Sequence, residues 1–260
     1  MLVLFLVLAG IPARGADAAP LSAQFTLTQE DLTRMVVALP DSVRSAIMAR
    51  PADFLRLLAA VLDEPGELFL LVDKRHPLDP TYAPADLVDL KHFPLKLSWP
   101  HLLLRKAVLP DLLAMARSAA ADGVTLTLTS TYRSYDYQRE VFAREVKLYG
   151  EPVAERESAH PGCSQHQLGT ALDFGSISDD YAQSAEGRWV TEHAWQFGFS
   201  LSYPQGYEEV TGYRHESWHY RYITPAGTIL QRRYFADVQQ YLLQFLHDNR
   251  TALTRARRTR

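Results

Sequence analysis

The segment GYRHESWHYRYI, residues 212–223, contains His215-Glu216-Ser217-Trp218-His219, which matches the pattern H-E-x-x-H. On a helix, residues i and i+4 share one face, so both imidazoles of this pattern bind one zinc ion and the glutamate acts as a base. The aromatic and β-branched residues of the segment favour a strand instead. We therefore predict a strand over residues 212–223.

On a strand, His215 and His219 also share a face, but they lie about 13 Å apart at a rise of about 3.3 Å per residue. Zinc–nitrogen bonds are about 2.0–2.1 Å long, so one ion cannot bind both side chains in that geometry. At most one of the two histidines is then a ligand of a given metal. The literal motif leaves one alternative open, a helical protease that uses both histidines.

A second group of candidate ligands lies upstream, in the stretch HPGCSQHQLGTALDF. Its Ser164, His166, Gly169 and Asp173 form the pattern S-x-H-x-x-G-x-x-x-D, with a glycine-containing turn and a short apolar stretch before Asp173. Catalytic zinc sites use three protein ligands and keep a fourth position open, and imidazole and carboxylate are suitable ligands. Glu216 could then act as general base on the attacking water.

Taken together, S-x-H-x-x-G-x-x-x-D followed by E-x-W-H resembles the VanY-type peptidases of the lysostaphin/D-Ala-D-Ala/hedgehog superfamily. The flanking segments LVDKRHPLDPTYAPADLV, STYRSYDYQ and EGRWVTEHAWQFGFSLSYPQG resemble that family as well. The similarity covers about residues 68–224. Because several motifs agree in order, the resemblance is far more specific than H-E-x-x-H alone.

The resemblance implies one zinc ion per chain, with His166, Asp173 and His219 as its ligands and Glu216 as the catalytic base. It gives His215 no ligand role. From the residues alone, Asp173 could also be a turn carboxylate. The spacing between His166 and Asp173 favours the ligand interpretation.

For the substrate side, the resemblance implies that Arg133 stabilises the oxyanion or binds substrate, and that Gln138 and Ser164 contact the substrate's terminal residues. Arginine and glutamine suit a substrate with a free carboxylate, which arginine binds bidentately. Two other interpretations stay open: Arg133 as a salt-bridged residue at a strand end, and Gln138 on the exposed face of its helix. Gln165 stands where many relatives carry glutamate, at a position that binds no metal.

The implied activity is that of a zinc-dependent peptidoglycan carboxypeptidase, whose partners are the stem peptides. We predict a D-alanyl-D-alanine carboxypeptidase, with an LD-carboxypeptidase acting on tetrapeptide stems as the alternative. A further alternative is a non-catalytic wall-binding module with a structural zinc. Glu216 argues against that module, because a structural site needs no base and takes a fourth protein ligand.

The composition is that of an ordinary globular protein of 260 residues, with 47% hydrophobic and 22% charged residues. The formal net charge of −3 gives no reason to expect nucleic-acid binding. Cys163 is the only cysteine, so the chain has no intramolecular disulfide. A role for Cys163 as a nucleophile or a zinc ligand is disfavoured, because it would need a paired histidine or would displace a better ligand.

The N-terminal stretch MLVLFLVLAG is continuously apolar, and Ala16-Asp17-Ala18 follows it. A short apolar core before an A-x-A-like site is typical of a signal peptide, here residues 1–19, although a basic start is missing. The run is shorter than the roughly 18–20 apolar residues of a spanning helix. We expect export to the periplasm or cell envelope and no transmembrane domain after cleavage, with an uncleaved anchor as the alternative.

The remaining pattern predicts an α+β fold, a small, largely antiparallel sheet with flanking helices. Apolar spacing predicts a helical appendage over residues 20–66. The family resemblance implies a VanY-type zinc peptidase domain over residues 67–249. Within that domain we expect strands at 68–72 and 124–130, helices at 110–123, 135–150 and 187–197, and one continuous C-terminal helix at 229–249. Residues 250–260 form a basic tail that we expect to be frayed, with contact to an anionic surface as the alternative.

Overall fold

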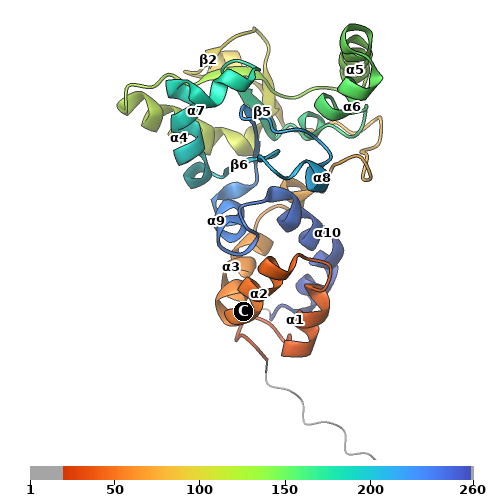
Figure 1. The fold of residues 1–260 in the computed structure, drawn as a ribbon. Helices are drawn as coiled ribbons and strands as arrows, with labels where there is room; N and C mark the ends of the chain where they lie inside the picture. Colours follow the sequence, from red (N-terminus) through yellow and green to blue (C-terminus); the bar gives the residue numbers. More distant parts are fainter. Residues whose placement is uncertain (1–19, 259–260) are drawn as a thin grey trace, which may run out of the picture.

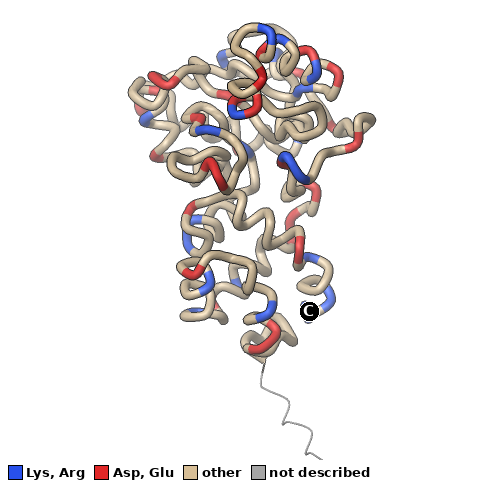
Figure 2. Tube along the Cα trace, turned by 45° about the vertical axis from the view of Figure 1, so that its right-hand side comes forward, with Lys and Arg blue, Asp and Glu red and all other residues tan. Residues whose placement is uncertain are grey.

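The computed structural model describes residues 20–258 of the chain. The predicted signal peptide, residues 1–19, lies outside this range. The sheet and most of the helices that cover it form one end of the molecule, and a group of helices forms the other (Figure 1). Acidic and basic residues are interspersed over both ends (Figure 2). No helix in the described range is long and apolar enough to cross a membrane.

A five-stranded sheet forms the centre of the upper part in Figure 1, with the strand order β2-β4-β5-β7-β6. The β2–β4 pair is parallel and the other three pairs are antiparallel, which confirms the expected α+β fold with a largely antiparallel sheet. A separate antiparallel pair consists of β1 (Leu87–Asp89) and β3 (Leu103–Arg105). The strands of the main sheet are β2 (Lys96–Leu97), β4 (Thr127–Ser130), β5 (Ala171–Phe174), β6 (Phe199–Leu201) and β7 (His219–Tyr222).

The helices beside the sheet begin where the sequence provides start signals. Pro110 lies in the first turn of one of them, and the hydroxyl of Ser134 caps another by accepting a hydrogen bond from the backbone N–H of Tyr137 at 3.2 Å. The helix predicted near 187–197 is an α-helix followed by a 3₁₀ turn, η6 (Ala194–Phe197). These helices are α4 (Leu109–Ala121), α5 (Tyr135–Tyr149), α6 (Glu151–Glu157), α7 (Ala185–His193) and α8 (Glu208–Thr211).

The predicted N-terminal helices pack on the C-terminal end of the chain, as the warm and blue ribbons at the lower end of Figure 1 show. Phe54 is fully buried there, and its ring contacts Tyr234, Phe235 and Phe245 at centroid distances of 5.3, 6.2 and 5.7 Å. The domain limits that the sequence suggests stay a prediction. The helices are α1 (Gln29–Met35), α2 (Asp41–Ala49), α3 (Pro51–Asp63), α9 (Thr224–Tyr234) and α10 (Gln239–Ala256).

Two expectations about the C-terminal region were wrong. The single helix predicted at 229–249 is broken between α9 and α10, because Ala236 and Asp237 adopt φ angles of 54° and 58°, which a right-handed helix excludes. The tail is not frayed up to residue 256, because α10 continues to Ala256 and buries Leu253. Beyond it, Arg257 forms an ion pair with Asp63 at 2.7 Å.

The strand predicted at residues 68–72 is also absent. That stretch begins as a 3₁₀ turn, η1 (Gly66–Phe69), and continues as irregular backbone. The carbonyls of Leu68 and Leu70 instead accept hydrogen bonds from the buried guanidinium of Arg221 at 3.1 and 2.8 Å. A side chain therefore satisfies backbone groups that a strand would have paired with a neighbouring strand.

We predict that Phe54→Ala lowers the free energy of unfolding by about 3–5 kcal/mol, because it empties a buried aromatic position between α3 and the two C-terminal helices. Urea denaturation followed by circular dichroism measures the change. The matched control, Val37→Ala, alters a side chain that is 64% exposed and should stay within about 0.5 kcal/mol of the unsubstituted protein. A Phe54→Ala change as small as that of the control would contradict this packing.

Candidate metal centre and active site

The sheet register brings two of the candidate ligands face to face. In the antiparallel pair β5–β7, Asp173 lies directly opposite His219. Opposite residues of such a pair project to the same face of the sheet, so both side chains enter one site. Leu172 and Tyr220, one position along each strand, project to the other face.

The third candidate ligand, His166, comes from the 3₁₀ turn η4 (Gln165–Leu168), just before β5. The hydroxyl of Ser164 accepts a hydrogen bond from the backbone N–H of His166 at 3.3 Å and so caps the turn. Gly169 ends it with a φ of 67°, and a Cβ there would lie 2.9 Å from the side chain of Leu87. The spacing S-x-H-x-x-G-x-x-x-D thus encodes a cap, a turn residue, a glycine reversal and a strand residue.

His166, Asp173 and His219 form the one group of possible metal ligands found in the described range, and their ligand atoms lie within 4.8 Å of one another. His166 Nε2 is 3.3 Å from Asp173 Oδ2, and His219 Nδ1 is 3.2 Å from Asp173 Oδ1. The two imidazole rings stand nearly perpendicular, with centroids 4.8 Å apart. All three side chains are buried.

The donor atoms of this group fit a zinc ion. His166 Nδ1 donates to the carbonyl of Thr131 at 2.7 Å, which leaves the lone pair of Nε2 facing the other two ligands. Asp173 Oδ1 is buried and accepts no hydrogen bond from the residues that the structure describes. Two imidazoles and one buried carboxylate together match a three-ligand catalytic zinc site.

The protonation states suit metal binding as well. Burial lowers the pKa of His166 to about 4, against the opposing influence of Asp173, so the imidazole is neutral at neutral pH. Burial by itself raises the pKa of Asp173, but the adjacent His166 and His219 outweigh it and hold that pKa well below its usual range. A neutral imidazole and an ionised carboxylate are the forms that bind metal.

Glu216 lies at the edge of this group. Its Oε2 is 3.5 Å from Nδ1 of His219, and the residue is 8% exposed. Burial raises the pKa of the Glu216 carboxyl to about 7, and His219 partly offsets that effect. A carboxyl with a pKa near neutrality can both accept and return a proton, which is what a general acid–base catalyst must do.

Arg133 reaches the site from the segment after β4, and its own backbone N–H donates to the carbonyl of His166 at 3.2 Å. Its guanidinium donates to Oε1 of Gln138 at 2.7 Å and to the hydroxyl of Ser130 at 3.1 Å. Within the described range Arg133 forms no salt bridge, which argues against the alternative of a salt-bridged strand end. Gln138 is fully buried, so the alternative that placed it on an exposed helix face was wrong. Its side-chain amide donates to the carbonyl of Ala159 at 2.6 Å.

Two residues around the ligands were missed at the sequence level. The ring of Tyr203 packs against the ring of His219 at a centroid distance of 4.8 Å. Gln165 Oε1 lies 3.4 Å from Nε2 of His219 and accepts a hydrogen bond from the hydroxyl of Ser202 at 2.7 Å. For Gln165, its place beside His166 was a signal that it lies near the ligands. For Tyr203 the sequence offered no such signal, because it lies 16 residues before His219.

The structure brings His219, and not His215, into the metal-binding group. The strand predicted over 212–223 exists only as β7, and its first half was wrong. Gly212, with a φ of 82°, ends α8, and the backbone N–H groups of Arg214 and Glu216 bond to Arg156 and Tyr203 rather than to a strand ladder. Aromatic content alone could not distinguish this irregular turn from a strand.

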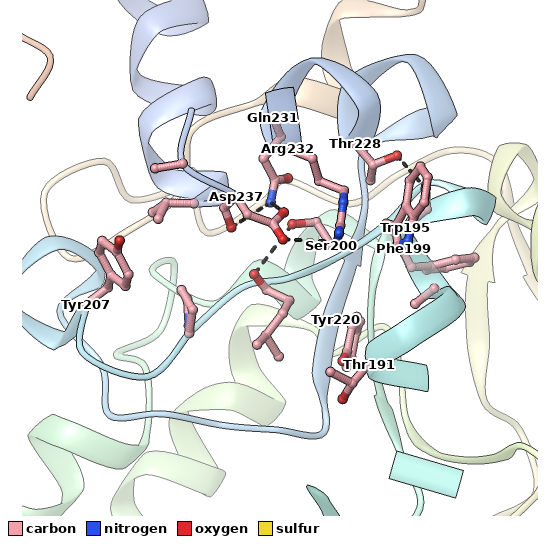
Figure 3. Close-up of a pocket in the computed structure, with 15 residues that line it drawn as sticks. Thr191, Trp195, Phe199, Ser200, Tyr207, Tyr220, Thr228, Gln231, Arg232 and Asp237 are labelled. Atoms are coloured by element: carbon pink, nitrogen blue, oxygen red, sulfur yellow. Dashed lines mark hydrogen bonds and ion pairs between the residues drawn. The ribbon is translucent and has the colours of Figure 1, made fainter. Parts of the chain in front are cut away.

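A cavity of about 200 Å³ lies beside the edge strand β6, between the sheet and the C-terminal helices (Figure 3). Phe199, Trp195 and Tyr220 line it, and an ion pair between Arg232 and Asp237, 3.1 Å long, borders it. Because neighbouring strand residues project to opposite faces, Tyr220 faces this cavity whereas His219 faces away from it. The cavity is therefore separate from the metal-binding group.

Comparison with known proteins matches residues 101–225 to the family described as VanY: D-alanyl-D-alanine carboxypeptidase. The chain is 35% identical over 170 residues to the putative carboxypeptidase YodJ of Bacillus subtilis, and the match covers 62% of each protein. The chain thus spans about three fifths of the length of this relative.

Two solved structures resemble about two thirds of the chain. The LdcB LD-carboxypeptidase has a TM-score of 0.61 at 31% identity, covering 69% of this chain and 86% of LdcB. The VanY D,D-pentapeptidase of a VanB-type resistance cassette, solved with Zn(II), has a TM-score of 0.57 at 28% identity. That match covers 69% of this chain and 99% of the VanY chain.

We predict that His166→Ala and His219→Ala each abolish stoichiometric zinc binding, because each removes one of three ligands. His215→Ala should retain the zinc of the unsubstituted protein, because His215 lies outside the group. Metal content after dialysis, measured by inductively coupled plasma mass spectrometry, decides between the two. Loss of zinc from His215→Ala together with its retention in His166→Ala would show that the ligand set is wrong.

Proposed function

The chain belongs to the VanY-type D-alanyl-D-alanine carboxypeptidase family, and on that premise we propose that it is a zinc-dependent peptidoglycan carboxypeptidase. In this proposal the enzyme hydrolyses the C-terminal D-alanine from stem peptides. The observation that supports it most directly is the buried carboxyl of Glu216 beside the His166–Asp173–His219 group. This combination of three ligands and an adjacent base is what metal-assisted peptide hydrolysis requires.

Zinc, when bound, would act as a Lewis acid that polarises the scissile carbonyl and makes water more acidic. Glu216 accepts the proton of the attacking water, because its raised pKa matches that task near neutral pH. The same carboxyl then donates the proton to the amine of the departing D-alanine. Because Glu216 is buried, the proton stays within the site during this exchange.

Arg133 would stabilise the negative charge on the carbonyl oxygen or bind the substrate's terminal carboxylate. Its hydrogen bond to Gln138 fixes one edge of the guanidinium, and Gln138 is itself held by the carbonyl of Ala159. A positively charged donor held in place before the reaction costs little reorganisation during it. We assign substrate contacts to Gln138 and Ser164 as well, as the family resemblance implies.

The alternative of a structural zinc in a non-catalytic wall-binding module fits less well. A structural site is closed by four protein ligands, and this group has three. A structural site also gives no reason to bury a fourth ionisable group, Glu216, with its pKa raised to about 7.

We further propose that the protein works in the periplasm or cell envelope, where its substrate lies. The support for export is the apolar N-terminal sequence followed by Ala16-Asp17-Ala18.

The specificity test is incubation of the purified protein with defined muropeptides, followed by mass spectrometry. We expect loss of one alanine from pentapeptide stems and no change in tetrapeptide stems, as a D,D-carboxypeptidase requires. Loss of alanine from tetrapeptide stems alone would identify an LD-carboxypeptidase instead. A protein that binds zinc and cleaves neither substrate would contradict the proposed enzyme and favour the binding module.

We predict that Glu216→Gln keeps its zinc and loses about 10²–10⁴-fold in kcat, because the amide cannot take the proton of the attacking water. Glu209→Gln, which alters an exposed glutamate on α8, is the matched control and should keep full activity. Steady-state kinetics on a pentapeptide substrate, with zinc content measured in parallel, test this prediction. Unaltered turnover by Glu216→Gln would exclude Glu216 as the base.

A further inference from the structure

The first histidine of the H-E-x-x-H pattern, His215, hydrogen-bonds to the main chain beside the candidate base. We propose that His215 is a positioning residue, which holds the catalytic base through the backbone carbonyl of Tyr203. This inference rests on the proposed function, since it concerns the placement of Glu216. It accounts for His215 without making it a metal ligand.

Two hydrogen bonds converge on one oxygen atom. The imidazole Nδ1 of His215 lies 2.9 Å from the carbonyl oxygen of Tyr203, and the backbone N–H of Glu216 donates to that same oxygen at 3.2 Å. A carbonyl oxygen only accepts, so the Nδ1 of His215 carries the proton. The side chain of His215 and the main chain of Glu216 are thus fixed against a single acceptor.

The His215 ring also lies beside a groove whose lining includes none of the three candidate ligands. His215 lines an open groove together with Tyr207, Glu208 and Tyr241, at the junction of α8 and α10. The Nδ1 of His215 is thus hydrogen-bonded to the carbonyl of Tyr203, and the same ring borders this groove. This arrangement explains why the His166–Asp173–His219 group forms without His215.

Tyr203 connects the base to a metal ligand. Its ring packs against the imidazole of His219, and its carbonyl accepts the N–H of Glu216. The preceding residue, Ser202, donates its backbone N–H to the carbonyl of His219 at 3.1 Å, which continues the β6–β7 pairing. Tyr203 is thus positioned by the sheet, and it transmits that position to both Glu216 and His219.

The turn at residues 212–218 depends on such contacts, because the sheet holds only its last residue, Trp218, whose carbonyl accepts the backbone N–H of Phe174 at 3.1 Å. Another anchor is Arg214, whose backbone N–H donates to the carbonyl of Arg156 at 3.1 Å and whose guanidinium pairs with Glu157 and Asp179 at the surface. The hydrogen bond from His215 is the side-chain anchor next to the base itself. Without it, the backbone of Glu216 retains its own N–H bond to Tyr203 and the bond that its carbonyl accepts from the N–H of His219 at 3.3 Å.

The consequence for the reaction is a change in turnover rather than in binding. A misplacement of about 1 Å in a catalytic group can cost about 10²-fold in rate. We therefore expect His215→Leu to reduce kcat by about 10–100-fold while KM and zinc content stay unchanged. His215→Asn should recover most of the lost kcat, because its amide N–H can donate from nearly the same place as Nδ1.

His193 provides a matched control. Its Nδ1 lies 2.9 Å from the carbonyl of Trp189, so His193→Leu removes the same kind of bond from a half-buried imidazole on α7. We expect kcat for His193→Leu to equal that of the unsubstituted enzyme. A loss in this control as large as in His215→Leu would show a general effect on folding and would overturn the positioning role.

Two further results would also overturn the proposal: wild-type kcat in His215→Leu, or a His215→Asn variant as slow as His215→Leu.

A readout independent of activity separates this proposal from the proposed function. NMR correlation of the imidazole nitrogens with their ring protons should show His215 as the Nδ1–H form with a slowly exchanging proton. A mobile ring in the Nε2–H form would refute the bond to Tyr203 even if the protein hydrolyses muropeptides. An enzyme inactive on every stem peptide, with His215 in the expected form, would refute the function and leave this bond in place.

Discussion

The pairing of Asp173 with His219 across β5 and β7 is the constraint on which the rest of the site depends. A buried carboxylate is costly unless opposite charge or hydrogen bonds compensate it. Here two imidazoles surround it, and one carboxylate oxygen is left without a hydrogen bond in the described structure. Because side chains alternate along a strand, a slip of one residue in this register would send His219 to the opposite face and dismantle the group.

The substrate side of the site is connected to this pairing through short backbone links. Two hydrogen bonds join the segment after β4 to His166. The carbonyl of Thr131 accepts from the Nδ1 of His166, and the backbone N–H of Arg133 donates to the carbonyl of His166. A ligand and the guanidinium proposed to face the substrate are therefore fixed to each other. Gln138, on the first turn of α5, holds the guanidinium from the other side. The site thus combines residues from three segments: η4 with β5, the segment from β4 to α5, and β7 with the turn before it. Hydrogen bonds fix the positions of these segments relative to one another.

The sequence predicted which three possible metal ligands come together better than it predicted the local structure around them. The spacing from Ser164 to Asp173 encodes a capped turn, a glycine reversal and a strand, and each of these depends on neighbours a few residues away. Residues 212–218 and 68–72 were assigned to strands because their composition suits strands, but distant partners decide their conformation. Tyr203 and Arg221 supply those partners, and composition contains no signal for such contacts. The break at Ala236 was missed for a similar reason, because its neighbours continue an amphipathic helical pattern on both sides.

Arg221 shows how the helical end of the molecule is tied to the metal-binding strand. It lies two residues after His219 on β7, so both side chains project to the same face of the sheet. Burial lowers the pKa of its guanidinium to about 10, which still leaves it charged at neutral pH. The carbonyls of Leu68 and Leu70 compensate part of that charge, and these bonds anchor the segment that follows α3. The segment could pair its carbonyls in a regular strand only by leaving this guanidinium uncompensated in the interior, at a cost of several kcal/mol. The irregular backbone at 68–72 is therefore a consequence of burying the guanidinium of Arg221. The hydrogen bonds from Arg221 to Leu68 and Leu70 also hold the N-terminal helices to β7, the strand that carries His219.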